Sequence, residues 1–128
     1  MTHLMELLEI KKVSESPGYV KLSMPVSDKV KQPFGYLHGG ATMTLGETAC
    51  SIGSFNLLEP SQGIPVGLEM NTNHIKSARE GMIYAEARIL HEGRSTHVWD
   101  IRMTNEDDEL ISVMRGTLAI KQIKRESV

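Results

Sequence analysis

The chain has 128 residues, 40% of them hydrophobic, and a formal net charge of −2. This length predicts one compact domain over residues 1–128 and is too short for two domains of ordinary size. The near-neutral balance argues against binding to nucleic acid or to an anionic membrane through overall charge.

The start of the chain and its cysteine and histidine content bear on compartment and metals. Residues 1–9 lack the basic segment and long apolar core of a signal peptide, and no segment approaches the roughly 20 apolar residues of a membrane span. We therefore expect a cytoplasmic protein without membrane partners.

The single cysteine, Cys50, excludes an internal disulfide, and the absence of closely paired histidines predicts no metal site. The basic residues within 121–125 are expected to form a solvated terminus.

The first predicted elements are a β-hairpin and a long helix. Residues 7–13 and 19–25 flank a Ser-Pro-Gly turn, and the second segment alternates apolar and polar residues, which predicts paired strands. From Gly39 to Glu59, apolar residues recur at helical spacing, and Pro60 then ends the pattern. This is the one long helix that the sequence predicts.

Four extended segments follow the helix, at residues 66–74, 82–92, 95–104 and 110–121. Glycines and an acidic turn separate them, and the short connections between the last strands predict antiparallel neighbours. The order ββαββββ therefore predicts an α+β fold in which the lone helix buries its apolar side against an antiparallel sheet.

The segment from Gln32 to Ser51 carries the chemistry. A glycine pair, Gly39-Gly40, lies at the start of the predicted helix, where backbone N–H groups at its positive end can approach and polarise a substrate carbonyl. Glu47 lies within the helix, where burying a charge would be costly without a purpose. The alternatives are a solvated carboxylate for Glu47 and a structural role for His38. Motifs of serine hydrolases, dinucleotide-binding folds and P-loops are absent from the sequence.

The pattern Gln-Pro-Phe-Gly-x-Leu-His-Gly-Gly-x6-Glu-x3-Ser over residues 32–51, with the order ββαββββ, resembles the hotdog-fold acyl-CoA thioesterases of the hydroxybenzoyl-CoA and phenylacetate-pathway type. Within them it is most similar to the 1,4-dihydroxy-2-naphthoyl-CoA thioesterases of menaquinone synthesis. The similarity continues through residues 66–81 and Trp99 and spans roughly residues 7–121. It implies a hotdog fold, with an antiparallel sheet wrapped around one long central helix.

The resemblance implies thioester hydrolysis with Glu47 as the catalytic carboxylate, acting as nucleophile or as general base on water. The N–H of Gly39 would bind the oxyanion. A thioester carbonyl is electrophilic enough for one carboxylate and one such donor to suffice. His38 and Gln32 would orient the thioester and the attacking group. Ser51, one turn beyond the glutamate, would hydrogen-bond the water or the acyl group.

The resemblance also implies that coenzyme A belongs to the substrate and that no separate cofactor is needed. The segments 74–79 and 91–96 combine cations with hydroxyls and match CoA-contacting segments of the family, although either alone is typical of a solvated turn. The substrate-binding residues implied are Gly67, His74, Lys76, Ser77, Arg79, His91, Gly93, Arg94, Ser95 and Thr96.

The spacing of Gly39 and Glu47 bears on assembly. Eight residues of helix separate them by about 12 Å along the axis, which exceeds the reach of a glutamate side chain. If both act on one thioester, each must come from a different subunit, with two helices meeting at a two-fold axis. The resemblance likewise implies dimers that share active sites and pair into a homotetramer.

The resemblance favours an aryl-CoA substrate, with the 1,4-dihydroxy-2-naphthoyl ester first. The acyl pocket is expected to be shaped by Leu37, Met43, Ile52 and Phe55. A broad-specificity aryl/acyl-CoA thioesterase of the phenylacetate type is the alternative. A non-catalytic acyl-CoA-binding module is the other class of function, and it would have no need of Glu47.

Overall fold

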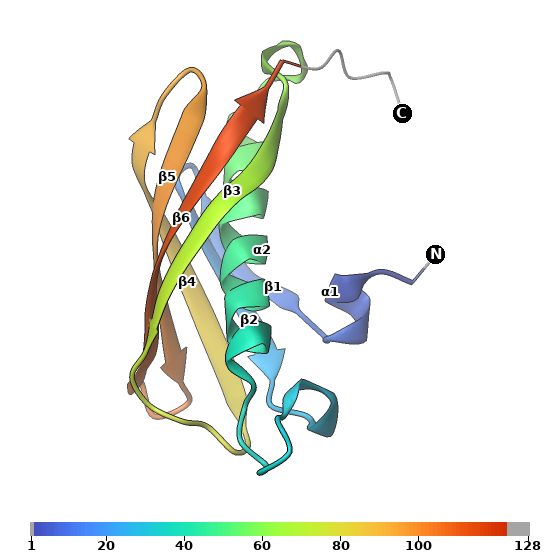
Figure 1. Cartoon of the computed structure of the whole chain (residues 1–128). Coiled ribbons are helices and arrows are strands. Elements are labelled where there is room, and N and C mark those ends of the chain that lie inside the picture. Colours follow the sequence, from blue (N-terminus) through green and yellow to red (C-terminus); the bar gives the residue numbers. More distant parts are fainter. Residues whose placement is uncertain (1, 123–128) are drawn as a thin grey trace.

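A curved antiparallel sheet partly encloses one long helix in the computed structural model of the chain, which describes residues 2–122 (Figure 1). The helices are α1 Leu4–Leu7 and α2 Gly39–Leu57, with 3-10 turns η1 Asp28–Val30 and η2 Pro60–Gln62. The strands are β1 Lys11–Ser16, β2 Tyr19–Pro25, β3 Ile64–His74, β4 Met82–Glu92, β5 Thr96–Asn105 and β6 Leu110–Lys121. The predicted α+β hotdog architecture is confirmed.

The sheet has six strands in the order β1-β2-β4-β5-β6-β3, and every neighbouring pair is antiparallel. The consecutive strands from β4 to β6 are neighbours, as short connections predict. β3 instead crosses to the far edge and pairs with β6 from Ile64↔Lys121 to His74↔Ser112. This crossing brings the end of β3 close to the start of α2.

The core lies between α2 and the concave face of the sheet. Leu45, Ala49 and Cys50 of the helix are fully buried there, and so are Trp99 and Met103 of β5. Burial, assisted by the nearby Glu47 charge, raises the pKa of the Cys50 thiol to about 12. Cys50 is therefore a small buried residue and not a reactive thiolate.

Predicted boundaries are wrong for the first strand and the long helix, and β3 begins at Ile64, two residues before its predicted start. Residues before Ile10 form α1 and a reversal at Glu9, whose φ is 58°, so the first strand begins at Lys11 and not at residue 7. The long helix ends at Leu57 and not at Glu59, because a residue that precedes a proline disfavours helical dihedrals.

Two expectations concern the ends of the chain and the membrane. Most of the predicted basic terminus, 121–125, lies outside the described residues. Within residues 2–122, every helix is too short or too polar to cross a membrane.

Candidate active site

The start of α2 presents one free backbone donor. His38 has extended dihedrals and caps the helix, with its Nδ1 accepting from the N–H of Gly40 at 2.8 Å. The carbonyl of His38 accepts from the N–H groups of Ala41 and Thr42. Among the described residues, the N–H of Gly39 donates to none. Of the predicted glycine pair, therefore, only Gly39 offers a free N–H at the positive end of the helix.

Gly39 is a glycine because the ring of His74 lies against it. A Cβ at this position would lie 2.7 Å from Nε2 of His74, which is closer than any real side chain approaches. The ring is held from its other side by the buried Ser112, whose Oγ lies 3.0 Å from Nδ1. The crossing of β3 thus brings together two predicted site residues that are far apart in the sequence.

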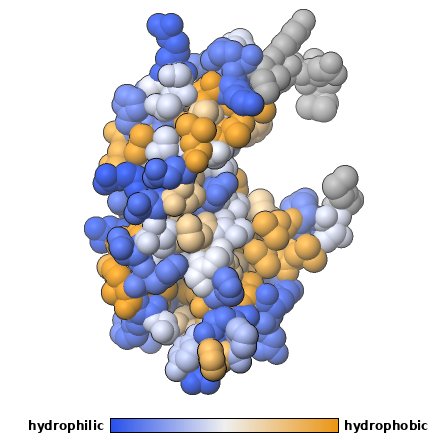
Figure 2. Space-filling view, viewed as in Figure 1, coloured by the Kyte–Doolittle hydropathy of each residue, from blue (hydrophilic) through white to orange (hydrophobic). Residues whose placement is uncertain are grey.

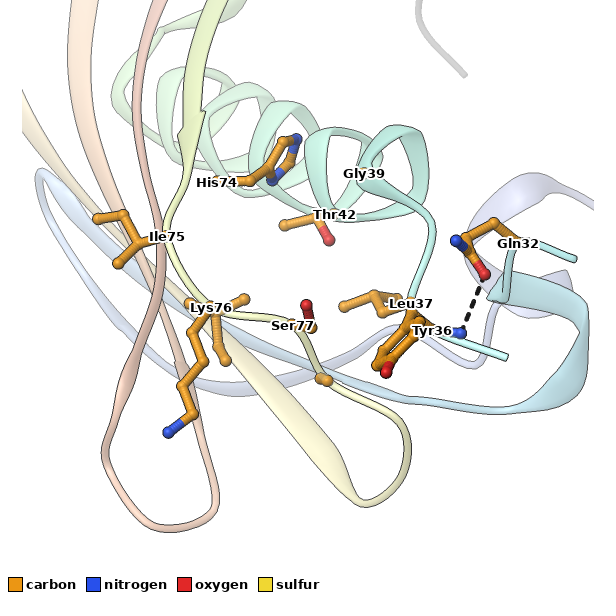
Figure 3. Close-up of a pocket in the computed structure, with 11 residues that line it drawn as sticks. Gln32, Tyr36, Leu37, Gly39, Thr42, His74, Ile75, Lys76 and Ser77 are labelled. Carbon is orange, nitrogen blue, oxygen red and sulfur yellow. Dashed lines mark hydrogen bonds between the residues drawn. The ribbon is translucent and has the colours of Figure 1, made fainter. Parts of the chain in front are cut away.

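The side-chain amide of Gln32 offers a second hydrogen-bond donor near Gly39 and His74. Its Oε1 accepts from the N–H of Phe34 at 2.7 Å and from the N–H of Tyr36 at 3.1 Å, and Figure 3 marks the second of these bonds. Because both donors are backbone N–H groups, the oxygen must face them, and the amide NH2 is left to donate elsewhere. No described residue accepts from that NH2 group.

These groups line a depression of about 350 Å³, which we call the Gly39 depression (Figure 3). Its lining includes Gln32, Leu37, Gly39, His74, Lys76 and Ser77. Glu47 and Ser51 are not among its lining residues. The chain therefore brings five of the predicted site residues together at one end of α2 without the proposed carboxylate.

Glu47 lies in a second depression, of about 370 Å³, which we call the Glu47 depression. Its lining residues are Leu4, Met5, Thr44, Glu47, Thr48, Ser51 and Ile52. The expectation that Glu47 is buried is wrong for the single chain, where the residue is exposed. It lies two residues from both Leu45 and Ala49, which places it on the side of the helix opposite the core.

The hydroxyl groups beside Glu47 differ in what they can bind. Thr44 and Thr48 donate to the carbonyls four residues earlier, those of Gly40 at 2.9 Å and Thr44 at 2.6 Å. The Ser51 hydroxyl has no hydrogen-bond partner among the described residues. Ser51 is therefore the side chain best able to bond a substrate hydroxyl or a water next to the carboxylate.

The expected acyl-pocket residues do not form one group. Ile52 lines the Glu47 depression, whereas Leu37 lines the Gly39 depression. Met43 packs against the core, and Phe55 is 52% exposed and lines neither depression. Of these four residues, only Ile52 lies beside the carboxylate within one chain.

The first expected CoA-binding segment is partly engaged within the chain. Lys76 forms an ion pair with Glu109, and this hydrogen bond is the main cause of the lowered pKa of the Glu109 carboxyl. The guanidinium of Arg79 stacks over the ring of Tyr36 at 4.8 Å, so it supports the loop at the Gly39 depression without lining it. Ser77 lines that depression directly.

The second expected CoA-binding segment forms the turn between β4 and β5. Gly93 donates its N–H to the carbonyl of Thr96 at 2.9 Å, and the ring of His91 packs over Gly93. Arg94 and Ser95 line a third depression, of about 680 Å³. Arg94 forms no ion pair with any residue in 2–122, which leaves its charge available to a phosphate.

The two halves of the expected site lie at opposite ends of the molecule. The Gly39 depression adjoins the start of α2, whereas the β4–β5 turn lies beside Leu58, just past its end (Figure 1). A helix of 19 residues is roughly 28 Å long at 1.5 Å per residue. One chain therefore brings together neither Gly39 with Glu47 nor the two CoA-binding segments.

Three residues near these depressions were missed from the sequence. Leu4 and Met5 belong to a four-residue helix, which is too short to produce a periodic signal. Ser112, which holds His74, did leave a signal. It is a buried polar residue among the apolar inward positions of β6, where an unpaired hydroxyl would be costly.

Comparisons with known proteins identify the family of the chain. The Thioesterase superfamily matches residues 34–112. The 1,4-dihydroxy-2-naphthoyl-CoA hydrolase of Listeria monocytogenes is 42% identical over 122 residues, which cover 95% of this chain and 98% of the relative. The enzyme of the same name from Escherichia coli is 42% identical over 101 residues, covering 79% of this chain and 74% of the relative.

Solved structures are similar over nearly the whole chain. The thioesterase SAV0944 of Staphylococcus aureus, solved as a Q32A variant, is 59% identical with a TM-score of 0.91 and covers 94% of this chain and 99% of its own. The Glu47Ala variant of SAV0944 has a TM-score of 0.92. The long family match and these relatives together show that the chain belongs to the thioesterase superfamily and has its hotdog fold.

Proposed function

We propose that the protein hydrolyses acyl-CoA thioesters, with Glu47 as nucleophile or general base and the Gly39 N–H as oxyanion donor. The observation that carries this proposal is the free Gly39 N–H at the positive end of α2, facing a depression that also receives the free amide of Gln32. A backbone donor at such a place stabilises the negative charge that develops on a thioester carbonyl under attack, and the Gln32 amide offers a second donor at the same depression.

The carboxylate supplies the second half of the chemistry. As a general base, Glu47 takes a proton from water while the hydroxide adds to the thioester carbon, and the carbonyl electron pair moves to the oxygen held by Gly39. Collapse of this intermediate expels the CoA thiolate, which takes up the proton. As a nucleophile, Glu47 would itself bond to that carbon and expel the thiolate, and water would then cleave the resulting anhydride.

The site is proposed to form between two subunits of a homodimer, and such dimers to pair into a tetramer. Gly39 and Glu47 line different depressions of one chain, and the two CoA-binding segments lie at opposite ends of α2. A two-fold pairing that brings the Glu47 depression of one subunit to the Gly39 depression of the other would complete two identical sites.

The favoured acyl group is a hydroxylated aryl ring, with 1,4-dihydroxy-2-naphthoyl-CoA as the leading candidate. Two curated relatives carry the name of a hydrolase of this ester at 42% identity. Beside the carboxylate, the free hydroxyl of Ser51 offers a hydrogen bond to a ring hydroxyl, and Ile52 offers an apolar contact. A broad-specificity aryl/acyl-CoA thioesterase is the alternative, since an aliphatic pocket discriminates weakly between apolar groups.

A hydrolysis screen tests both levels of this proposal. Aryl-CoA and straight-chain acyl-CoA esters are each incubated with the protein, and release of the CoA thiol is recorded. The dihydroxynaphthoyl ester should have the highest kcat/KM, with lower values for benzoyl and phenylacetyl esters. A preference for long-chain esters would reject the aryl substrate, and no thiol release from any ester would reject the activity.

A further inference from the structure

The edge strand β3 has a bulge directly beside the Glu47 carboxylate. β3 pairs with β6 residue by residue until Gly67↔Leu118 and Glu69↔Thr117, so Leu68 is an extra residue. A bulge of this kind re-aims the side chains around it. Leu68 is 62% exposed, whereas Gly67 lies under the end of the Glu47 side chain.

The only close neighbour of a Cβ at Gly67 would be this carboxylate. The added atom would lie 2.8 Å from Oε2 and 3.3 Å from Cδ of Glu47, and the next atom, Cδ2 of Leu118, would be at an ordinary 3.8 Å. The φ of Gly67 is not in the left-handed region, so its backbone conformation does not require glycine. The residue is also exposed, so core packing does not require it.

Glu47 lacks the contacts that usually fix a catalytic carboxylate. It forms no ion pair with a described residue, and the neighbouring threonine hydroxyls are engaged with the backbone. Within one chain, therefore, the shape of its surroundings sets where the carboxylate lies. On the side that faces β3, the carboxylate has room because Gly67 has no side chain.

We propose that Gly67 is a positioning residue for Glu47, and that its missing Cβ keeps open the space in which the reacting carboxylate lies. This inference rests on the function proposed above. It differs from a substrate contact at Gly67, because it acts on bond breaking through Glu47 and leaves CoA binding unchanged. The bulge serves catalysis by placing a residue without a side chain opposite the carboxylate.

The variant Gly67→Ala tests the proposal. The added methyl clashes only with the flexible end of one exposed side chain, so the melting temperature should stay within about 2 °C of wild type. The carboxylate should shift, and because misplacement by about 1 Å can cost 10²-fold in rate, we expect kcat to fall about 10-fold or more. KM should stay within about twofold, since an interaction made only in the transition state is lost.

Two double variants separate positioning from other effects. In a Glu47→Ala background, Gly67→Ala should leave the residual rate unchanged, because no carboxylate remains to be moved. In a Glu47→Asp background, the shorter side chain withdraws from the methyl, so Gly67→Ala should cost much less than it does beside glutamate. An equal loss of kcat in all three backgrounds would overturn the proposal.

The other outcomes are also decisive. A raised KM with unchanged kcat would assign Gly67 to substrate binding, and a melting temperature lowered by more than about 4 °C would assign it to the fold; either overturns the positioning role. A crystal structure of Gly67→Ala gives a readout that needs no activity. An unmoved carboxylate there would overturn the inference even in an active enzyme, whereas a displaced one would support it even if the wild type hydrolysed no thioester.

Discussion

Glu47 stands on the exposed side of α2 and has no ion-pair partner within residues 2–122. Removing its carboxylate therefore leaves no buried charge unpaired. We expect Glu47→Ala to lower kcat by about 10²-fold or more, since a positioned base or nucleophile contributes at least this much, while the melting temperature stays near that of wild type. Glu47→Gln, which keeps the shape and loses the charge, should be similarly impaired. Turnover close to wild type in either variant would refute the assignment.

A buried histidine makes stability depend on pH. His97 is 1% exposed, and its Nδ1 lies 2.8 Å from the hydroxyl of Ser54, which accepts from the indole N–H of Trp99 at 2.8 Å. Burial is the main reason why the pKa of His97 is lowered from its usual 6.5. The unfolded chain therefore binds this proton more readily than the folded one.

The sign of the pH effect follows from that difference. The contribution of a neutral His97 is fully present above about pH 6.5 and is lost as the pH falls from there toward the lowered folded pKa. We expect the melting temperature to drop between pH 7.5 and pH 5.5, and to drop less in His97→Gln, which keeps a polar partner for Ser54 and cannot be protonated. Equal drops in the two proteins would place the pH dependence elsewhere.

At the scale of single residues, the motif predicts which residues belong to the site better than it predicts the hydrogen bonds that they form. A glycine at the start of a helix already implies an accessible N–H, and Gly39 has one. That the Gly40 N–H is taken by His38 could not be read from the sequence, because it depends on the rotamer of the capping ring. The exposure of Glu47 could have been predicted, since Leu45 and Ala49 set the buried side of the helix.

Among the α-helices and strands, α1 is the one that the sequence missed, and it adjoins the Glu47 depression. Leu4 lines the Glu47 depression, whereas Leu7, on the same helix and about equally exposed at 52% against 54%, does not. Figure 2 shows hydrophobic side chains gathered at this helix. The two leucines therefore form a matched pair of test positions.

We expect Leu4→Ala to change the ratio of kcat/KM between aryl and straight-chain acyl-CoA esters by about threefold or more. Contacts of one or a few methylenes with an acyl group are worth about 1–3 kcal/mol of discrimination. Leu7→Ala should leave the ratio unchanged. The two variants are compared on the same pair of esters, and equal effects would show that α1 does not contact the acyl group.

The two proposed CoA-binding segments should differ in how much the loss of a cation raises KM. Lys76 is already paired with Glu109, whereas Arg94 forms no ion pair with a described residue. Arg94→Ala should therefore raise KM more than Lys76→Ala, with kcat little changed in both, because phosphate contacts are made equally in the ground and transition states. The KM of Arg94→Ala should also depend less on salt. A collapse of kcat at unchanged KM would place these cations at the reacting bond.

Alternation and turn residues predicted where the strands lie, but not their order in the sheet. Five strands lie next to a sequence neighbour, which local connections explain. β3 pairs with β6, with two strands between them in the chain, and this choice depends on long-range packing of the helix against the whole sheet. The Gly39 depression exists because of that pairing, so residue spacing alone could not bring its lining together, whereas the family resemblance named five of its residues.

For the whole molecule, the proposal of a site shared between two subunits predicts complementation between damaged subunits. Glu47→Ala removes one half of each site, and Gly39→Ala disturbs the other half by displacing His74. Mixed dimers of the two variants contain one site with both groups intact. After verified subunit exchange, we expect the mixture to recover part of the wild-type rate. Random exchange makes about half of the dimers mixed, and each mixed dimer has one intact site of its two, so the recovered rate should be at most about a quarter of wild type. No recovery, or full activity in a sedimentation-defined monomer, would rule out shared sites.

The length of helix α2 fixes the distance and the relative orientation of Gly39 and Glu47. Because the helix is continuous from Gly39 past Glu47, inserting one residue between them would rotate Glu47 by about 100° and advance it by about 1.5 Å, to the present place of Thr48 and away from the space above Gly67. Deleting one residue would rotate it equally far the other way. Exposed side chains in this stretch can vary, but its length cannot, so insertions and deletions across residues 39–47 should abolish thioesterase activity and, by turning Leu45 or Ala49 out of the core, also lower the melting temperature.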